Sequence, residues 1–150
     1  SKLLEDSAIN AYKKLLLPLA DLVTPNIFEA NLLSNLDINN EEDIEESAKS
    51  IIKLGAKAVL IKGGGLKDMK GRDFYLDVNG GKKWFINKFI NTQNTHGSGC
   101  TLSAAICGYQ ALGFDLIESI QKSKLFIERS LKNSYQIGSG PGPLGHYQSL

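Results

Sequence analysis

The chain has 150 residues, which is long enough for one domain with a sizeable hydrophobic core. Its composition, 42% hydrophobic and 22% charged residues, is that of a folded globular protein and excludes disordered, collagen-like and membrane-spanning classes. Lys and Arg number 17 against 16 Asp and Glu, and the net charge of +1 excludes a strongly basic nucleic-acid-binding surface. We therefore expect a single domain over residues 1–150, with neither nucleic acid nor membrane as a partner.

The first quarter of the chain is predicted to form a helix, a short strand and a second helix. The pattern of apolar residues favours a helix over residues 7–16 and a strand over residues 19–23. The strand stops at Thr24-Pro25, because the residue before a proline avoids helical geometry. The next helix begins near Asn26 and ends by Asn35.

A longer third helix is predicted to follow, with Asn39 or Asn40 as its N-terminal cap and Gly55 at its end. Its apolar residues fall on one face: Ile44, Ala48, Ile51 and Ile52. The acidic residues near its beginning suit a solvated first turn that complements the helix dipole: Glu41, Glu42, Asp43, Glu45 and Glu46. We expect this helix to support the core and to carry no chemistry.

The middle of the chain is predicted to form strands. Residues 58–61 are a continuous apolar run, typical of a strand buried on both faces of a parallel sheet, and residues 62–65 end it with a lysine and three glycines. Residues 72–78 and 82–86, joined by Asn79-Gly80-Gly81, predict a β-hairpin. Because strands alternate with helices, we expect an α/β fold with a largely parallel sheet that carries an antiparallel hairpin.

The most informative segment is residues 94–105, a glycine-rich loop that leads directly into an apolar helix. Gly97 and Gly99 allow positive φ and close approach of an anion to the backbone. The first amides of the helix have no intrahelical partner, and the helix dipole adds partial positive charge there. The segment therefore predicts a phosphate-binding site, although an ordinary loop before a helix is the alternative.

Two further helices follow this loop. The first extends over residues 100–112 and ends at Gly113, and the second over residues 116–135. The dipole of the first contributes only ~1 kcal/mol, which is too little to neutralise a triphosphate, so cations are expected from elsewhere in the chain. The glycine- and proline-rich residues 138–146 are either a flexible end or an ordered flap.

Two sources of positive charge, a metal ion and a lysine, are predicted at the ends of two strands, where ligands bind in open α/β sheets. Asn26 and Glu29, three residues apart at a helix start, offer hard oxygen ligands to Mg²⁺, with a helix-capping box as the alternative. Lys62 follows a buried strand and can reach a phosphate, with a solubilising surface lysine as the alternative. Together with the anion site, these residues supply what phosphoryl transfer requires.

Cys100 lies where a group near the attacking hydroxyl would be placed. A helix N-terminus lowers a thiol pKa from its usual ~8.5, whereas a neighbouring phosphate raises it, so its protonation state stays open. Covalent thiol catalysis is disfavoured because no motif ties either histidine to Cys100, and His96 precedes the glycine turn. Cys107 lies too far along the helix for a disulfide, and we assign it to the core and Met69 to a loop.

Four segments together resemble a known family: residues 22–30, 59–64, 94–105 and 142–146. In order and spacing they resemble the hydroxymethylpyrimidine and phosphomethylpyrimidine kinases of thiamine biosynthesis, which have a ribokinase-like fold. The resemblance extends over essentially all 150 residues, and the loop that ends in cysteine is its most specific part.

The resemblance implies ATP and Mg²⁺ as cofactors and a small pyrimidine as substrate. It implies an anion hole formed by Gly97, Ser98, Gly99 and Cys100, with Cys100 in the position of the catalytic base. It also implies that Asn26 and Glu29 arrange Mg²⁺ and phosphates. The residues it places near the nucleotide are Lys62, Gly63, Thr95, Gly97 and Gly99.

Two departures from the family pattern matter. Ser98 replaces a common threonine and keeps its hydroxyl. The front portion of the family has no counterpart, so the chain resembles the carboxyl-terminal, ATP-side half, and alone it is expected to bind nucleotide without turnover. No signal peptide is visible in residues 1–6. We expect a preceding segment, because the chain begins without methionine and in the middle of a pattern.

Two alternatives stay open. The first is a pyridoxal kinase of the same fold, although related sugar and pyridoxal kinases generally carry aspartate where this chain has Cys100. The second is a non-catalytic nucleotide-binding fragment or partner subunit, which a true start at Ser1 would favour. We also expect a cytoplasmic protein that forms a homo-oligomer, most simply a dimer; the two cysteines suit a reducing compartment.

Overall fold

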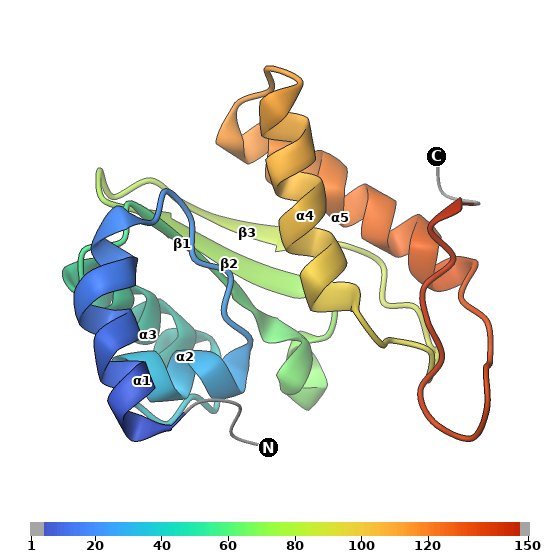
Figure 1. Ribbon diagram of the computed structural model, residues 1–150, viewed down its shortest axis with the longest axis horizontal. Helices are drawn as coiled ribbons and strands as arrows, with labels where there is room; N and C mark the ends of the chain where they lie inside the picture. Colours follow the sequence, from blue (N-terminus) through green and yellow to red (C-terminus); the bar gives the residue numbers. More distant parts are fainter. Residues whose placement is uncertain (1–4, 148–150) are drawn as a thin grey trace. The chain divides into compact units, whose positions relative to one another are not determined.

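The computed structural model describes residues 5–147 and divides the chain into two units, Ser1–Ile86 and Asn87–Leu150 (Figure 1). Residues 1–4, part of the stretch in which the sequence shows no signal peptide, lie outside the described residues. The single domain expected from the sequence stays a prediction, and each unit is described by itself below.

The first unit begins with a helix whose geometry changes along its length. It opens as α1 (Asp6–Ala11), continues as one π-helical turn, η1 (Tyr12–Leu16), and closes as a 3-10 turn, η2 (Leu17–Leu19). The helix predicted over residues 7–16 is therefore present. Proline at the start of η2 lacks the N–H that an α-helix needs, and the chain becomes extended at Ala20.

The next two helices begin and end at residues that cap them. Asn26 precedes α2 (Ile27–Ser34), and Asn35 ends it in the left-handed region with φ 58°. Asn40, rather than Asn39, caps α3 (Glu41–Lys53), because its Oδ1 accepts a hydrogen bond from the Asp43 N–H at 2.9 Å. Both helices agree with their sequence-based predictions.

Three antiparallel strands form the sheet in the order β1 (Ala58–Lys62), β2 (Arg72–Asp77) and β3 (Lys82–Ile86). The predicted buried strand and hairpin are therefore confirmed. The segment between β1 and β2 holds only two 3-10 turns, η3 (Gly63–Gly65) and η4 (Lys67–Met69). It is too short for the crossover that parallel strands require, so the chain returns antiparallel.

Parallel pairing is less extensive than the sequence indicated. In the described part of the first unit it consists of two isolated bridges, Val23 with Val59 and Asn26 with Lys62. The strand predicted over residues 19–23 is wrong in extent, because Leu19 belongs to η2 and only Val23 pairs. The α/β class holds, with a sheet whose named strands are antiparallel.

The core of the first unit lies between the sheet and its helices. Phe74 of β2 is 1% exposed, and its ring centroid lies 4.9 Å from that of Trp84 on β3. From α3, three fully buried residues pack into the same cluster: Ile44, Ala48 and Ile51. Met69, expected in a loop, lies in η4 and is buried in this core as well.

The second unit is built on two helices that pack together, α4 (Ser98–Ala111) and α5 (Leu116–Lys132). The αL conformation of Gly113 separates them, as predicted. Cys107 is exposed, so its assignment to the core is wrong: α4 directs Leu102 and Ile106 inward, and Cys107 lies off that face. Among the described residues, no helix combines the length and apolar character needed to cross a bilayer.

Candidate functional site

The glycine turn at the start of α4 has the geometry that the sequence predicted. Gly97 is the N-cap of the helix in the left-handed region, with φ 81° and ψ 2°. A Cβ built at this position would meet no atom within 4 Å, so glycine is required for conformation and the space in front of the turn is open. The helix begins at Ser98, two residues earlier than predicted.

The amides of this turn divide into bonded and outward-facing groups. The Ser98 N–H donates to Thr95 O at 3.2 Å, and the Thr101 N–H donates to Gly97 O at 2.9 Å. Between them, the N–H groups of Gly99 and Cys100 belong to the first turn and have no intrahelical acceptor. In the described chain, no side-chain hydrogen bond caps α4. These two N–H groups are therefore the candidate donors to an anion at this turn.

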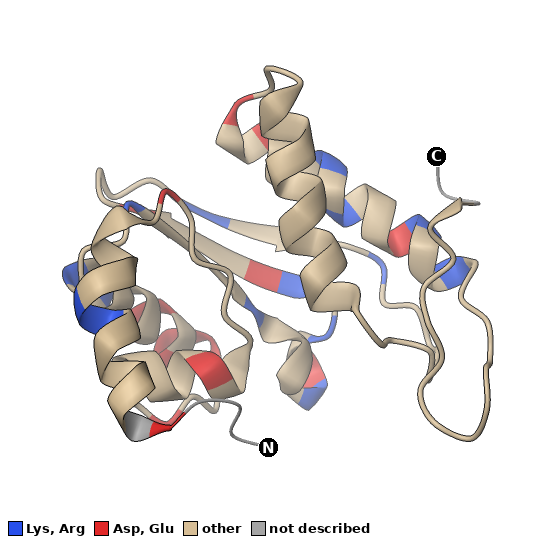
Figure 2. Cartoon of the chain, viewed as in Figure 1, with Lys and Arg blue, Asp and Glu red and all other residues tan. Residues whose placement is uncertain are grey.

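α4 itself brings no side-chain charge to this turn. Figure 2 shows α4 without a charged side chain along its length, in agreement with its sequence. The helix dipole therefore supplies the positive potential at its N-terminus. Cys100 is exposed at the same turn with a free thiol, so a reactant can reach its Sγ.

The loop before α4 is fastened to the end of the chain. Asn94 Oδ1 accepts a hydrogen bond from the Gly142 N–H at 3.0 Å, and the His96 N–H donates to Gly142 O at 3.2 Å. A Cβ on Gly142 would lie 2.1 Å from Tyr135 O, so only glycine fits there. Of the two alternatives for residues 138–146, these contacts favour an ordered segment. Thr95, expected near the nucleotide, is exposed in this loop.

In the first unit, Asn26 and Glu29 form a complete capping box at the start of α2. Asn26 Oδ1 accepts from the Glu29 N–H at 2.9 Å, and Glu29 Oε2 accepts from the Asn26 N–H at 2.7 Å. The capping alternative is therefore realised. Both residues are exposed, and burial and the nearby Glu29 charge raise the pKa of Tyr12 above its usual value.

Asn26 and Glu29 also carry oxygen atoms of the kind that bind Mg²⁺. Among the described residues, no group of three or more His, Cys, Asp or Glu side chains is placed to hold a metal. Mg²⁺ commonly takes one or two carboxylates and fills its remaining positions with water and substrate phosphates. Glu29 has a second carboxylate oxygen outside the capping bond, so the donor set fits a metal bound mainly through phosphates.

Lys62 lies at the end of β1, next to the start of α2. Its N–H donates to Pro25 O at 2.9 Å, and its backbone forms a parallel bridge with Asn26. The sheet thus brings Asn26 and Lys62 together, as the sequence indicated. Lys62 is half-buried, and its side chain starts from the edge that carries the capping box.

Asp73 is a residue that the sequence did not single out. It is 8% exposed on β2, directly opposite Lys62, and its Oδ1 accepts from the Gly63 N–H at 3.2 Å. A Cβ on Gly63 would lie 2.3 Å from Arg72 O, so the turn after β1 also requires glycine. The available signal in the sequence was an acidic residue near the start of an apolar strand.

The predicted site residues therefore fall into two groups. Asn26, Glu29, Lys62 and Gly63 lie at one edge of the first unit, and residues 95–100 form the turn of the second unit. That both groups face one crevice stays a prediction.

Comparison with known proteins gives consistent matches. A family model described as phosphomethylpyrimidine kinase matches residues 1–145. The hydroxymethylpyrimidine/phosphomethylpyrimidine kinase of Synechococcus elongatus is 43% identical over 151 residues, which cover 99% of this chain and 56% of that protein. The chain thus spans about half the length of the curated relatives it matches.

Two solved structures are similar as well. The pyridoxal kinase of Staphylococcus aureus, in complex with AMP-PCP and pyridoxal, is 35% identical with a TM-score of 0.92 and covers 99% of this chain and 55% of its own. The phosphomethylpyrimidine kinase of Clostridium difficile 630 is 35% identical with a TM-score of 0.71 and covers 85% and 50%. Both are kinases of the ribokinase-like fold, as the sequence predicted.

Proposed function

The chain belongs to the phosphomethylpyrimidine kinase family, and from this premise we propose that it is the ATP-binding part of a thiamine-pathway kinase. The reaction is the phosphorylation of hydroxymethylpyrimidine and then of its monophosphate. The observation that carries the proposal is the left-handed Gly97 turn, which leaves the N–H groups of Gly99 and Cys100 without a capping side chain at the start of an uncharged helix.

The transfer step follows from these groups. The hydroxyl or phosphate oxygen of the pyrimidine attacks the γ-phosphorus of ATP in line; the new P–O bond forms as the bond to the β-phosphate oxygen breaks, leaving ADP. The N–H groups of Gly99 and Cys100 hold the charge that develops on the phosphoryl oxygens. In this proposal, Sγ of Cys100 accepts the proton of the attacking hydroxyl.

The positive charge for this step would come from Lys62 and from a Mg²⁺ held by Asn26 and Glu29. Asn26 and Glu29 would hold Mg²⁺, which when bound screens the repulsion between phosphates. Lys62 contributes a point charge from the end of β1. The bridge between Asn26 and Lys62 supports this assignment, because it places their backbones side by side.

A pyridoxal kinase is the second candidate, and a specific observation supports it. The pyridoxal kinase structure has a TM-score of 0.92, against 0.71 for the phosphomethylpyrimidine kinase structure. Sequence identity supports the pyrimidine substrate, at 43% for the Synechococcus relative against 35% for the pyridoxal kinase. Cys100 supports the pyrimidine substrate too, because pyridoxal kinases generally carry aspartate at this position.

Parallel phosphorylation assays test the two candidates. The full-length protein is supplied with ATP and Mg²⁺ and with hydroxymethylpyrimidine, its monophosphate or pyridoxal in turn. We expect higher kcat/KM for both pyrimidines. Higher kcat/KM for pyridoxal would move the assignment to the second candidate, and absence of transfer to all three would contradict a kinase.

A non-catalytic nucleotide-binding subunit is the remaining alternative, and the half-length match to the relatives keeps it in view. Determination of the gene sequence upstream of Ser1 separates the two: an in-frame extension supports the kinase, and a true start at Ser1 supports the subunit. A cytoplasmic homodimer with a small-molecule substrate remains part of the proposal.

A further inference from the structure

Thr101 and His146 form a contact beside the Gly97 turn that the proposed reaction does not use. Thr101 Oγ1 and His146 Nε2 are 2.9 Å apart, a hydrogen-bond distance. The Thr101 N–H donates to Gly97 O at 2.9 Å, which closes the first turn of α4 on the left-handed glycine. His146 is therefore joined, through one residue, to the turn that offers its amides to phosphate.

The ring of His146 is held in place by α5. It stacks on the ring of Phe126, with centroids 6.2 Å apart and an angle of 10° between the planes. The Gly145 N–H donates to Ser130 O at 3.0 Å, and Leu144 is 3% exposed. A Cβ on Gly145 would lie 2.1 Å from Asn133 O, so the chain passes too close to α5 for another residue.

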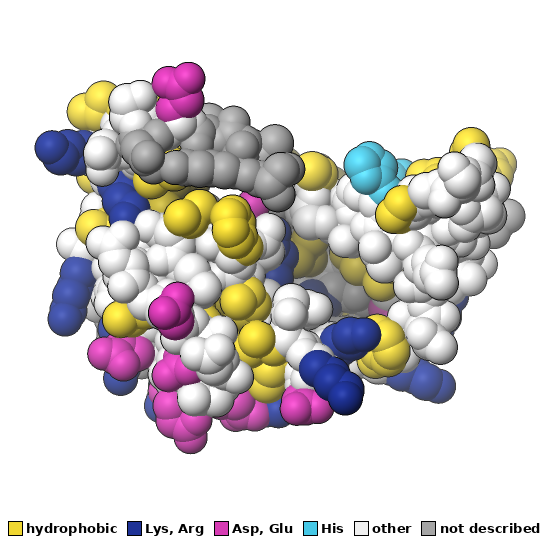
Figure 3. Space-filling model, turned by 90° about the horizontal axis from the view of Figure 1, so that it is seen from below, with side chains coloured by type: hydrophobic (Ala, Val, Ile, Leu, Met, Phe, Trp, Pro, Cys, Tyr) yellow, Lys and Arg dark blue, Asp and Glu magenta, His cyan; other side chains and the backbone are white. Residues whose placement is uncertain are grey.

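The same short segment also holds the other end of the turn. Gly142 bonds to the loop through Asn94 and His96, as described above. Residues 142–146 thus bracket the loop from Asn94 to Thr101 on both sides. Both histidines are exposed, and histidine side chains, cyan in Figure 3, lie at the surface of the view from below.

From these contacts we propose that His146 is a positioning residue for the phosphate-binding turn, acting through Thr101. This inference rests on the proposed function and deepens it. Fixing the Thr101 side chain restrains the first turn of α4, so the N–H groups of Gly99 and Cys100 keep their outward direction before phosphate arrives. N–H donors that are already oriented bind phosphate more tightly, because less conformational entropy is lost on binding.

Paired substitutions test the proposal in the full-length protein, with ADP as the probe in calorimetric titration. Thr101→Val keeps the shape of the side chain and removes its oxygen. His146→Phe keeps a ring to stack on Phe126 and removes the nitrogen. We expect each to weaken ADP binding by about two- to tenfold, the range for one hydrogen bond. The double variant should be no weaker, because both substitutions remove the same bond. Thr101→Ser, which keeps the hydroxyl, should restore wild-type affinity.

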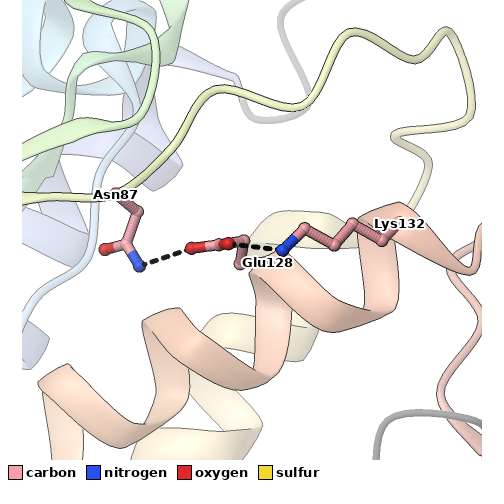
Figure 4. Close-up of polar contacts among 3 residues, drawn as sticks. All are labelled: Asn87, Glu128 and Lys132. Carbon is pink, nitrogen blue, oxygen red and sulfur yellow. Dashed lines mark hydrogen bonds and ion pairs between the residues drawn. The ribbon is translucent and has the colours of Figure 1, made fainter.

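Glu128→Gln is the matched control for a merely structural effect. Glu128 of α5 accepts hydrogen bonds from Lys132 Nζ at 2.8 Å and Asn87 Nδ2 at 3.2 Å, and neither partner belongs to the turn of residues 94–101 (Figure 4). The Lys132 and Asn87 hydrogen bonds lower the pKa of this carboxyl. Loss of the Glu128 carboxylate in Glu128→Gln should lower the thermal midpoint and leave ADP affinity unchanged.

Amide hydrogen exchange gives a second readout. At Thr101, whose N–H donates to Gly97 O, exchange should be faster in His146→Phe than in the unaltered chain, and unchanged in Glu128→Gln. If the unaltered chain binds ADP and Thr101→Val and His146→Phe bind it equally well, the role of His146 is overturned alone. An equal loss of affinity in Glu128→Gln would overturn it too. If the unaltered chain binds no ADP, the proposed function fails and this role fails with it.

Discussion

Cys100 is the side chain on which the proton transfer of the proposed reaction depends. It is exposed at the first turn of α4, and its own N–H is one of the two groups proposed to bind the phosphate. Cys100→Ala removes Sγ and keeps the backbone donor. In the full-length enzyme we expect kcat to fall by at least ~10²-fold, the usual contribution of a general base, with nucleotide affinity nearly unchanged. Steady-state kinetics with an ADP titration measures both.

Cys107→Ala is the control for this substitution, because Cys107 is an exposed free thiol on the same helix. It should leave kcat and nucleotide affinity as they are. Wild-type turnover in Cys100→Ala would remove the thiol from the mechanism and leave the backbone site in place.

Glu29 has two roles that one substitution separates. Its Oε2 caps α2, and its carboxylate charge is proposed to help hold Mg²⁺. Glu29→Gln keeps an oxygen that can accept from the Asn26 N–H and removes the charge. The Mg²⁺ concentration for half-maximal activity should rise by about tenfold, equivalent to ~1.4 kcal/mol, while the thermal midpoint changes little. An unchanged Mg²⁺ titration would leave Glu29 with the capping role alone.

At the scale of elements, the hairpin of β2 and β3 contains a pH-sensitive contact. The Tyr75 hydroxyl donates to Asp77 Oδ2 at 3.2 Å, while Oδ1 of Asp77 accepts from the Asn79 and Gly81 N–H groups. Burial, the Asp77 charge and this hydrogen bond raise the pKa of Tyr75 to about 12 from 10.0. Neutral Tyr75 is therefore favoured in the folded chain.

The contact between Tyr75 and Asp77 should weaken at high pH. With the folded pKa above the unfolded one, the contribution to stability is complete below pH 10.0 and is lost as the pH rises toward about 12. Denaturant unfolding across this interval should show a smaller loss of free energy of unfolding in Tyr75→Phe than in the wild type. Tyr109→Phe, which removes a phenol from α4, should follow the wild type. Identical slopes for Tyr75→Phe and the wild type would contradict the assignment.

The elements that were predictable from sequence are those fixed by local chemistry. Asn26, Asn35 and Asn40 mark helix ends through their own hydrogen bonds or backbone conformation, and the Asn79-Gly80-Gly81 turn fixes the hairpin. The Gly97 turn belongs to the same class, because glycine is needed at a positive φ.

Other features depend on partners that are distant in sequence. The predicted strand before Asn26 shrinks to bridges, because pairing is decided by the neighbouring strand and not by the local pattern. Asp73, Thr101 and His146 acquire their roles only when β1 meets β2 or when the chain end meets α4. The exposure of Cys107 depends on which face of α4 is packed.

At the scale of the whole molecule, the residues of the proposed phosphate-binding site lie in two units of the described chain. The first carries the capping box and Lys62, and the second carries the Gly97 turn and the segment that brackets it. A near-neutral chain with an uncharged α4 favours binding through backbone donors and a few placed charges over a broad electrostatic field.

The central claim is that the N–H groups of Gly99 and Cys100 hold the phosphates of the nucleotide. Titration of the ¹⁵N-labelled 150-residue chain with AMP-PCP and Mg²⁺, followed by amide chemical shifts, tests it most directly. The account predicts that the largest amide shifts occur at residues 97–101 and that Gly97→Val abolishes them. Saturable AMP-PCP binding that leaves the amides of residues 97–101 unshifted would contradict it.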